Sequence, residues 1–406
     1  MAIAKDQKPH IGIFGRRNTG KSSFINALAG QYISIVSEVA GTTTDPVKKS
    51  IEIFGIGPAI VIDTAGIDDE GTLGAKRVDK TLEVIKIIDI AVLIIAGNEF
   101  GNFEIQMFTL FEEYNLPHII IHNKSDKEKV NSSTLKKINE YSQGMVIDFN
   151  ALYAVNFEEV INRMKNILPE GIYQKPSILG DLIRKNDSVL LIAPVDAEAP
   201  DGRLILPQVM TIRDVLDNHC ISIVLQDTEL EHFLHHSAVK PALAITDSQA
   251  FEKVNSLIPD CIPLTSFSIL FARLKGCFEE YLKGTVAISS LKDGDRVLIL
   301  ESCTHQVNCD DIGRYKIPEW IKNYTGKNLH FDIVAGLDSV KNPVCNYSLV
   351  IQCGGCMVTR KQIENRLKPA IQKNIPVTNY GMAIAYVHGI FNRAVAPFLW
   401  KKQQNV

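Results

Sequence analysis

The sequence has no long hydrophobic run of the kind that crosses a membrane or directs secretion. Its longest apolar run, residues 87–96, is interrupted by Asp89 and is far shorter than the ~20 residues of a membrane-spanning helix. The first ten residues contain Lys5, Asp6 and Lys8, where a secretory signal requires an uninterrupted apolar stretch. We therefore expect a cytoplasmic protein without a membrane partner.

A surplus of charge of one sign is also absent. The 406 residues include 43 basic and 46 acidic side chains, which gives a formal net charge of -3. Proteins that bind RNA or DNA usually carry a basic surface, and the sequence has no convincing basic patch. We therefore expect no nucleic-acid partner.

Cysteine is missing from the first 219 residues, and all eight cysteines lie in the remainder of the chain. In a reducing compartment such clustering indicates metal or redox chemistry that is confined to one part of the chain. Cys220, Cys261 and Cys277 lie in apolar surroundings, and we interpret them as ordinary buried thiols.

The chain is too long for one hydrophobic core, and its apolar pattern divides it into three parts. Over 8–170, short apolar runs alternate with helix-length amphipathic stretches, which predicts a mostly parallel sheet with helices on both faces. A segment rich in proline and glycine, 169–176, interrupts this alternation. Smaller α/β units are expected over 178–260 and 265–406, so the predicted fold class is α/β throughout.

Twelve apolar runs are the expected strands. The unit at 178–260 has no glycine-rich turn after its first strand, so a docking or dimerisation module fits it better than a second nucleotide site. In the third part we expect one amphipathic helix over 266–283 and further helices near 317–324 and 361–373. The expected strands are 11–14, 51–54, 59–62, 91–96, 118–122, 145–149, 189–193, 221–225, 242–246, 296–300, 331–334 and 348–352.

Residues 15–22, Gly-Arg-Arg-Asn-Thr-Gly-Lys-Ser, match the pattern of a phosphate-binding loop between a strand and an apolar helix. Glycines in such a loop let backbone N–H groups face phosphates at the N-terminus of a helix. Lys21 brings a positive charge to the outer phosphates, and the Ser22 hydroxyl can hold magnesium. The loop therefore predicts a nucleoside triphosphate bound with Mg2+.

Two further motifs follow in the order that a GTPase requires. Asp63-Thr64-Ala65-Gly66 ends an apolar strand, so Asp63 can reach the magnesium and the Gly66 N–H can meet the γ-phosphate. Asn123-Lys124-Ser125-Asp126 follows the candidate strand 118–122. The Asp126 carboxylate can accept two N–H donors that guanine presents and adenine lacks, which predicts GTP or GDP. Asn150-Ala151 is a weaker match to the last guanine-contacting loop.

This set of motifs resembles the TRAFAC class of GTPases, and within it the TrmE and Era group. Residues 41–45, Gly-Thr-Thr-Thr-Asp, are similar to that group's Gly-Thr-Thr-Arg-Asp switch segment, with Thr44 in place of the arginine. The resemblance implies that Thr43 is the switch threonine, a magnesium ligand and, with Lys21, a catalytic residue. The expected nucleotide-binding set is Gly15, Asn18, Thr19, Gly20, Lys21, Ser22, Ser23, Thr43, Asp63, Gly66, Asn123, Lys124, Asp126, Asn150 and Ala151.

Asn18 matches the phosphate-loop asparagine that binds potassium in TrmE-like proteins. A monovalent cation at this place can supply the charge that an arginine finger gives to other GTPases. Ile67 stands where Ras-like proteins keep a water-orienting glutamine. We therefore expect slow hydrolysis that K+ stimulates, and the other interpretation of Asn18 is a simple loop hydrogen bond.

A second group of motifs carries sulfur. Cys303-Thr304-His305 and Cys353-Gly354-Gly355-Cys356 each follow a predicted strand, and the loops after parallel strands gather at one edge of a sheet. The glycine pair lets both sulfurs of the second motif face one centre. Cys303, His305, Cys353 and Cys356 are the candidate ligands, and Cys309 and Cys345 are interpreted as buried or incidental thiols.

Three thiolates favour an iron–sulfur cluster with a weaker or exchangeable fourth ligand. A structural zinc site with three cysteines and one histidine uses the same residue types and stays open as an alternative. A thioredoxin-like dithiol is a third interpretation of the Cys-x-x-Cys motif.

Over essentially its full length the chain resembles the GTPase scaffold proteins of [FeFe]-hydrogenase maturation, the HydF family. Besides the phosphate loop and the cysteine set, residues 199–208, Ala-Pro-Asp-Gly-Arg-Leu-Ile-Leu-Pro-Gln, carry this resemblance. It implies a GTPase domain over 8–170, a dimerisation domain over 178–260 and a [4Fe-4S] cluster domain over 265–406, in a homodimer or a dimer of dimers. It also implies a carrier that receives a di-iron precursor made with two radical-SAM maturases and delivers it to the apo-[FeFe]-hydrogenase.

One position departs from the family pattern. Gln352 stands directly before the Cys-Gly-Gly-Cys segment, where many members have histidine. The fourth cluster ligand therefore stays open between His305, a nearby carboxylate and solvent. The alternative function is a ribosome- or tRNA-acting GTPase of the TrmE or Era type with a structural zinc site, which predicts a basic C-terminal module in place of cysteine-rich loops.

Overall fold

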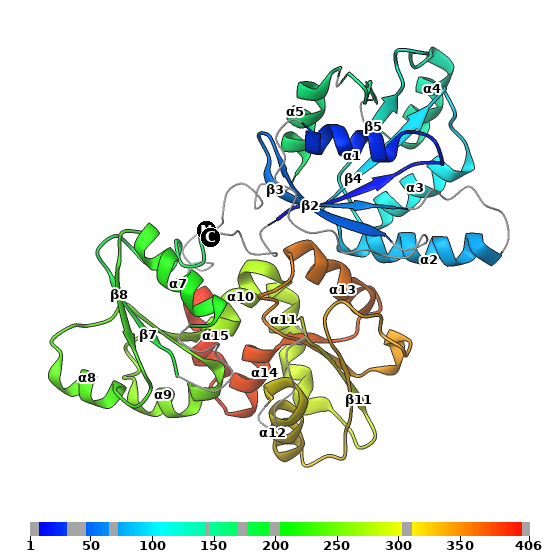
Figure 1. The fold of residues 1–406 in the computed structure, drawn as a ribbon. Coiled ribbons are helices and arrows are strands. Elements are labelled where there is room, and N and C mark those ends of the chain that lie inside the picture. Colours follow the sequence, from blue (N-terminus) through cyan, green and yellow to red (C-terminus); the bar gives the residue numbers. More distant parts are fainter. Residues whose placement is uncertain are drawn as a thin grey trace. The chain divides into compact units, whose positions relative to one another are not determined.

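The computed structural model describes residues 8–30, 46–64, 72–142, 146–153, 155–168, 177–194, 204–302 and 311–399, with the backbone alone for 72–79. The chain forms two compact units, residues 1–175 and 176–406 (Figure 1). Each unit is built on parallel β-structure, which confirms the expected α/β class.

A six-stranded sheet forms the centre of the first unit, in the order β2-β3-β1-β4-β5-β6. All neighbouring strands are parallel except β2, which runs antiparallel to β3. The strands are β1 (His10–Phe14), β2 (Val47–Ile53), β3 (Gly57–Asp63), β4 (Ile90–Ala96), β5 (His118–Asn123) and β6 (Val146–Asp148).

Helices cover both faces of this sheet, as the alternating pattern predicted. One buried cluster joins α1 and α5 to one face, and a separate cluster joins α2, α3 and α4 to the other. Every residue of β4 but the last is buried, because this central strand has helices above and below it. The helices are α1 (Lys21–Gly30), α2 (Thr72–Ile87), α3 (Asn102–Glu113), α4 (Ser132–Tyr141) and α5 (Phe157–Ile167).

The second unit contains two four-stranded sheets. Their orders are β10-β9-β7-β8 and β12-β11-β13-β14, and all neighbouring strands in both are parallel. The strands are β7 (Ser188–Ile192), β8 (Ile221–Leu225), β9 (Leu243–Thr246), β10 (Leu264–Ser266), β11 (Arg296–Leu300), β12 (His330–Val334), β13 (Leu349–Gln352) and β14 (Val377–Asn379).

Helices of this unit connect and cover the two sheets. The helices before the second sheet are α7 (Leu206–Asp217), α8 (Leu230–His236), α9 (Phe251–Leu257), α10 (Phe267–Lys275) and α11 (Phe278–Thr285). Those that follow β11 are α12 (Ile317–Thr325), α13 (Arg360–Gln372), α14 (Tyr380–Val387) and α15 (Phe391–Leu399).

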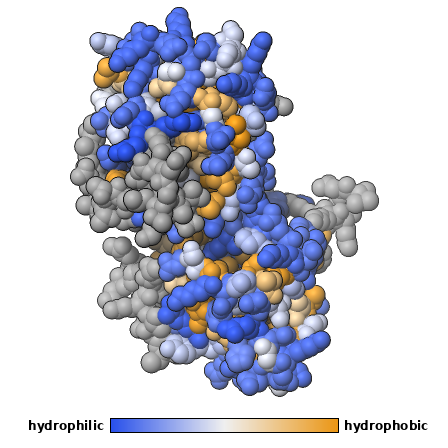
Figure 2. Space-filling view, turned by 90° about the vertical axis from the view of Figure 1, so that its right-hand side faces the viewer, coloured by the Kyte–Doolittle hydropathy of each residue, from blue (hydrophilic) through white to orange (hydrophobic). Residues whose placement is uncertain are grey.

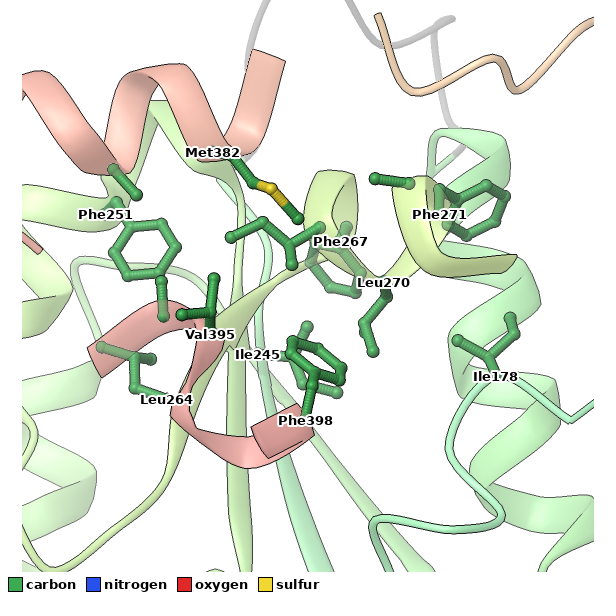
Figure 3. Packing of buried hydrophobic residues seen from close by; sticks show 14 of the residues in the cluster. Ile178, Ile245, Phe251, Leu264, Phe267, Leu270, Phe271, Met382, Val395 and Phe398 are labelled. Carbon is green, nitrogen blue, oxygen red and sulfur yellow. The ribbon is translucent and has the colours of Figure 1, made fainter. Parts of the chain in front are cut away.

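One hydrophobic core serves both of these sheets. It extends along the chain from Ile178 to Phe398, and Figure 3 shows Phe267 and Leu270 of α10 close to Met382 and to Phe398 of the last helix. The guanidinium of Arg393 on α15 also donates to backbone oxygens near the end of α9, among them that of Ile258 at 2.8 Å. The boundary proposed between 260 and 265 therefore lies within a shared core.

The expected helix over 266–283 is interrupted in the structure. Helix α10 ends at Lys275, and Gly276 is extended, with φ -110° and ψ -173°. A Cβ at Gly276 would collide with the ring of Tyr281 and the carbonyl oxygen of Ala272. The amphipathic period continues through this break, because α11 buries Tyr281 on the same side, and the periodicity alone therefore concealed it.

Polar residues cover most of the surface in the view of Figure 2, and apolar residues gather there in small groups. Within the ranges that the structure describes, no helix combines the length and apolar character that a bilayer-spanning segment needs.

Candidate functional site

The phosphate-loop segment connects β1 to the start of α1 and depends on two glycines. Gly15 has φ 147° and Gly20 has φ 93°, a region that side chains disfavour. A Cβ at Gly15 would collide with the carbonyl oxygen of Ile94, and one at Gly20 with the side-chain amide of Asn123. The glycines therefore let the loop lie directly against β4 and the loop after β5.

Lys21 begins α1, and its side chain folds back over the loop. Its ammonium donates to the carbonyl oxygens of Gly15, at 2.8 Å, and Arg16, at 2.7 Å. The buried Thr19 closes the loop from within by donating its hydroxyl to the Arg16 carbonyl at 3.0 Å. These contacts hold a positive charge beside backbone N–H groups at a helix N-terminus, an arrangement suited to phosphate.

A buried ion pair fixes the outer side of the loop. The guanidinium of Arg16 binds Glu104 through two bonds, Nε to Oε1 at 2.8 Å and Nη2 to Oε2 at 2.9 Å. Glu104 is 1% exposed, and it also accepts the N–H of Gly101 at the start of α3. Paired N–H···O bonds of this kind are strong and set orientation. The phosphate-loop pattern leaves position 16 unspecified, so the motif analysis missed this pair.

Asp63 and Ser22 lie at the place where the motifs predict magnesium. The Ser22 hydroxyl is 3.5 Å from Asp63 Oδ2, and within the described part of the chain the buried Oδ1 has no hydrogen-bond partner. Burial raises the pKa of Asp63, and the positive charges of Lys21 and Lys49 oppose this rise. A carboxylate oxygen without a partner beside a hydroxyl suits an oxygen-preferring cation such as Mg2+.

The loop after β5 binds the phosphate loop and the loop at residue 150 together. The amide of Asn123 donates to the Thr19 carbonyl at 2.9 Å and accepts the Ala151 N–H at 3.1 Å. Lys124 has φ 61°, and its ammonium donates to the carbonyl oxygen of Asn18. One asparagine and one lysine thus join three segments that are far apart in the sequence.

Asp126 projects from this assembly as an exposed carboxylate. Its loop is anchored by the Ser125 N–H, which donates to the Phe149 carbonyl at 3.1 Å. Asn150 is buried, and its side-chain oxygen accepts the Leu152 N–H at 2.9 Å. The carboxylate is therefore held on a rigid support and free to meet a base from solvent.

The structure brings together the expected nucleotide-site residues that it describes, at the carboxyl ends of the parallel strands. Asn18 is exposed there in a left-handed conformation with φ 62°, and Ser23 is exposed in the first turn of α1. Thr43 and Gly66 lie outside the described residues.

The Cys-x-x-Cys segment begins directly after β13, at the carboxyl edge of the second sheet of its unit. Cys353 and Cys356 are both partly buried. Gly355 between them has φ 68°, and a Cβ there would collide with the side chain of Ile363 on α13. The tight turn between the two cysteines therefore requires glycine at this position.

The Cys353 sulfur lies among N–H and O–H groups of the neighbouring strand. The Ser302 N–H donates to the sulfur at 3.1 Å, and the thiol lies 3.1 Å from the Ser302 hydroxyl. Burial raises the pKa of the Cys353 thiol, and its bonds with Ser302 lower it. Ser302 follows β11 and directly precedes Cys303. The residue that contacts the Cys353 sulfur is therefore the sequence neighbour of the other cysteine motif.

Gln352 lies beneath the sulfur and is fully buried. Its side-chain amide nitrogen is 2.9 Å from the Ser302 hydroxyl and 3.6 Å from the Cys353 sulfur. Its Oε1 atom is buried without a partner in the resolved part of the site. In this chain the residue before the cysteine loop thus presents an N–H donor to the sulfur.

The other two expected ligands, Cys303 and His305, lie outside the described residues, as does Cys309. Among the side chains that the structure places, no group of three or more histidine, cysteine, aspartate or glutamate residues could hold a metal ion. Cys353 and Cys356 are thus the described half of the predicted ligand set, and Cys345 is exposed elsewhere on the unit.

Family models match most of the chain in three consecutive segments. Residues 10–124 match the model described as 50S ribosome-binding GTPase. Residues 178–276 match the hydrogen maturase F dimerization domain, and residues 279–397 match the hydrogen maturase F tetramerization domain.

Curated relatives resemble part of the chain. The tRNA modification GTPase MnmE of Chromobacterium violaceum is 37% identical over 118 residues, which cover 29% of this chain and 26% of that protein. The GTPase Der of Mycoplasmopsis pulmonis is 35% identical over 190 residues, 43% of each chain. The chain thus spans less than half the length of these relatives.

Solved structures also match in part. The crystal structure of Aquifex aeolicus Era bound to GDP and aluminium fluoride covers 53% of this chain and 92% of its own, with 20% identity and a TM-score of 0.34.

Proposed function

Since the chain belongs to the hydrogen maturase F (HydF) family, we propose that it is a GTP-hydrolysing scaffold that binds a [4Fe-4S] cluster and carries the di-iron precursor of the [FeFe]-hydrogenase active site. Its partners in this role are the two radical-SAM maturases that make the precursor and the apo-hydrogenase that receives it. The ribosome- or tRNA-acting alternative is not favoured, because the second unit matches hydrogen maturase models over nearly its whole length.

The nucleotide site supports hydrolysis of GTP by its own residues. Lys21 and the N–H groups at the start of α1 hold the phosphates, and Ser22 and Asp63 hold Mg2+, which supplies positive charge to the phosphate oxygens. Asp126 selects guanine. Asn123 holds the segment that carries Asp126 against the phosphate loop through its hydrogen bond to the Thr19 carbonyl. Thr43 completes this site as the switch threonine.

We expect K+ to accelerate GTP hydrolysis at least about tenfold over Na+ at equal ionic strength, because a cation beside the phosphates replaces an arginine finger. Asn18→Gly should abolish this difference. Glycine removes the side chain and keeps the φ of 62° that an alanine would strain. Hydrolysis rates in K+ and Na+ buffers measure the effect.

Asn115→Gly is the matched control for this experiment. Asn115 also has a positive φ, of 45°, but follows α3 at the amino end of β5, outside the site. Equal rates in K+ and Na+ for the unaltered protein would remove the potassium proposal, as would an Asn18→Gly variant that keeps full stimulation.

The observation that best supports the cluster proposal is the contact between Ser302 and the Cys353 sulfur. At 3.1 Å it supports a common centre for the two sulfur-bearing motifs, although they are fifty residues apart. N–H donors from Ser302 and Gln352 suit a thiolate, which is the form of cysteine that binds iron. The described pair, Cys353 and Cys356, therefore suits a cluster, and we propose Cys303 as its third thiolate ligand.

A bound [4Fe-4S] cluster would supply an iron with an exchangeable fourth position, to which another metal fragment can bridge. The chain's own contribution is to hold the sulfurs, orient the loop and limit solvent access. His305, a nearby carboxylate and solvent are the candidates for the fourth position, and the buried Gln352 instead directs its amide toward the Cys353 sulfur.

Anaerobic iron and sulfide analysis of the purified or reconstituted protein tests this proposal. We expect a brown protein with iron and sulfide in equal amounts. A colourless protein that contains zinc would instead support a structural zinc site.

Strand β8 supports self-association of the chain, as a homodimer or a dimer of dimers. It stands at one end of its sheet, and no strand pairs with its outer edge within the described residues. Ile221 is 55% exposed and Val224 is 43% exposed on this strand, and Leu216 is 55% exposed on the preceding helix. Exposed apolar edge strands commonly pair with another chain, so we propose that β8 meets a second copy.

Val224→Asp should weaken the dimer by roughly 100-fold, because an unpaired charge would be buried on association. Sedimentation equilibrium measures the dissociation constant. Val239→Asp is the control, since Val239 has a similar exposure of 42% but lies outside every strand. Unaltered association of Val224→Asp would exclude β8 from the interface.

A further inference from the structure

The ammonium of Lys275 is buried beneath the cysteine loop. Lys275 is the last residue of α10 and is 7% exposed. Its Nζ atom donates to the backbone carbonyl oxygens of Gly355 at 3.1 Å, Cys356 at 3.3 Å and Val358 at 3.1 Å. An ammonium group has three N–H donors, so each of them can meet one of these carbonyls.

Helix α10 also forms the floor on which the loop rests. A Cβ at Gly354 would lie 3.9 Å from the Ser268 hydroxyl and 4.0 Å from the Phe271 Cβ atom. The Phe271 ring lies 5.9 Å from the Lys275 ammonium, within cation–π range. The first half of the loop thus packs against α10, and the second half is tied to the end of the same helix.

The orientation of these three carbonyls also sets the orientation of the N–H groups that follow them in the loop. In a trans peptide the C=O and N–H groups point in opposite directions. Carbonyls that turn toward Lys275 therefore turn the next N–H groups away from it. Without the ammonium, the three carbonyls would lose this donor, although the Gly355 oxygen would still accept the Val358 N–H at 3.3 Å. Loss of a hydrogen-bond donor is costly inside a protein, so the loop would rearrange.

The charge of Lys275 matters as well. A cluster with three thiolate ligands is an anion and gains one more negative charge on one-electron reduction. A buried positive charge interacts strongly with a nearby anion because the surrounding dielectric constant is low. A cation beneath the loop therefore favours the reduced cluster over the oxidised one.

We propose that Lys275 is a positioning residue for the cluster: its ammonium holds the cysteine loop in the conformation that accepts iron, and its charge favours the cluster's reduced state. The inference rests on the proposed function, since it concerns a cluster at Cys353 and Cys356. It adds a residue about eighty positions away in the sequence, outside any cysteine motif.

Three substitutions separate the two effects in the full-length chain. Lys275→Met keeps the length of the side chain without its donors or charge, Lys275→Gln keeps donors without charge, and Lys275→Arg keeps both. Lys283→Met is the control, because Lys283 is 71% exposed on the adjacent helix α11. Each protein is reconstituted anaerobically, checked by far-ultraviolet circular dichroism, treated with an iron chelator and titrated with dithionite.

We expect Lys275→Met to lose iron to the chelator at least tenfold faster than the unaltered protein, and Lys275→Gln, which keeps amide donors, to lose it at an intermediate rate. Their one-electron reduction should be at least tenfold less favourable, a shift of 59 mV to more negative potential. Lys275→Arg should recover most of the potential, and Lys283→Met should match the unaltered protein. If Lys275→Met does not fold, the potential of Lys275→Gln still tests the charge, and its rate of iron loss tests the donors, because the amide offers two N–H groups in place of three.

Neutral variants with unchanged chelation rate and unchanged potential would overturn the inference and leave the cluster proposal intact. A changed chelation rate with an unchanged potential would overturn the charge effect. An unaltered protein that takes up no iron and sulfide would instead overturn the proposed function, and the inference with it.

Discussion

Asp126→Asn is expected to weaken GTP binding by roughly 100-fold or more. In the proposed site the carboxylate would accept two N–H donors from guanine, and hydrogen bonds to a charged group contribute about 1.5–3 kcal/mol each. Asparagine offers one acceptor and places an N–H group against a guanine donor. A loss of about 3 kcal/mol corresponds to a 100-fold change in dissociation constant, which titration with a fluorescent guanine nucleotide measures.

The same substitution should improve the binding of xanthosine triphosphate. Xanthine has a carbonyl where guanine has an amino group, and the new amide can donate to it. Glu128→Gln is the control, because Glu128 is an exposed carboxylate two residues away and its loss changes the net charge equally. Equal weakening by both variants would mean that Asp126 acts only through its charge.

Cys353→Ala is expected to remove most of the iron and sulfide from the reconstituted protein. The substitution deletes one proposed ligand, whose sulfur also accepts the Ser302 N–H. Loss of a partner that merely supports a metal ligand typically weakens metal binding 10- to 100-fold, so loss of the ligand itself should weaken it by roughly 100-fold or more. Iron analysis and the rate of iron loss to a chelator measure this.

Cys345→Ala is the matched control for this experiment. Cys345 lies in the turn Val344–Asn346 between β12 and β13 and is exposed. It should leave the iron content unchanged. A Cys353→Ala protein that keeps its full iron and sulfide would exclude the Cys-x-x-Cys segment from the cluster, and a parallel loss in Cys345→Ala would implicate general instability.

The positions of the nucleotide-binding motifs on the fold were predictable because their chemistry is local in sequence. Each motif must place particular atoms within a few residues of a strand end, and the structure has Lys21, Asp63 and Asp126 close to the ends of β1, β3 and β5. The contacts that join the motifs were not predictable. The Asn123 amide reaches Thr19 across 104 positions, and nothing near either residue indicates this bond.

The fold was predictable where apolar runs are long and less so where they are short. Strands β10 and β14 have three residues each and directly follow Pro263 and Pro376, so neither forms an apolar run of its own. Each becomes a strand because it pairs with a longer neighbour, β9 or β13. This is a tertiary effect, and local periodicity carries no signal of it.

The position of Lys275 at the candidate site is likewise a tertiary effect that the local sequence does not reveal. A lysine in the last turn of a helix is usually an exposed partner of the helix dipole. Burial of its ammonium against carbonyls about eighty residues away follows only from the packing of α10 under the loop. Its role was therefore invisible in the sequence.

The core shared by the two sheets of the second unit has a thermodynamic consequence. Phe267 and Leu270 pack in the same cluster as Ile245 of one sheet and Val350 of the other, so neither sheet can melt without exposing the other's apolar residues. Free energy released when metal fills the cysteine loop is folding free energy. Because the two sheets share this core, that free energy would stabilise both of them. Metal bound at the cysteine loop would therefore also make β8, on the other sheet, harder to unfold.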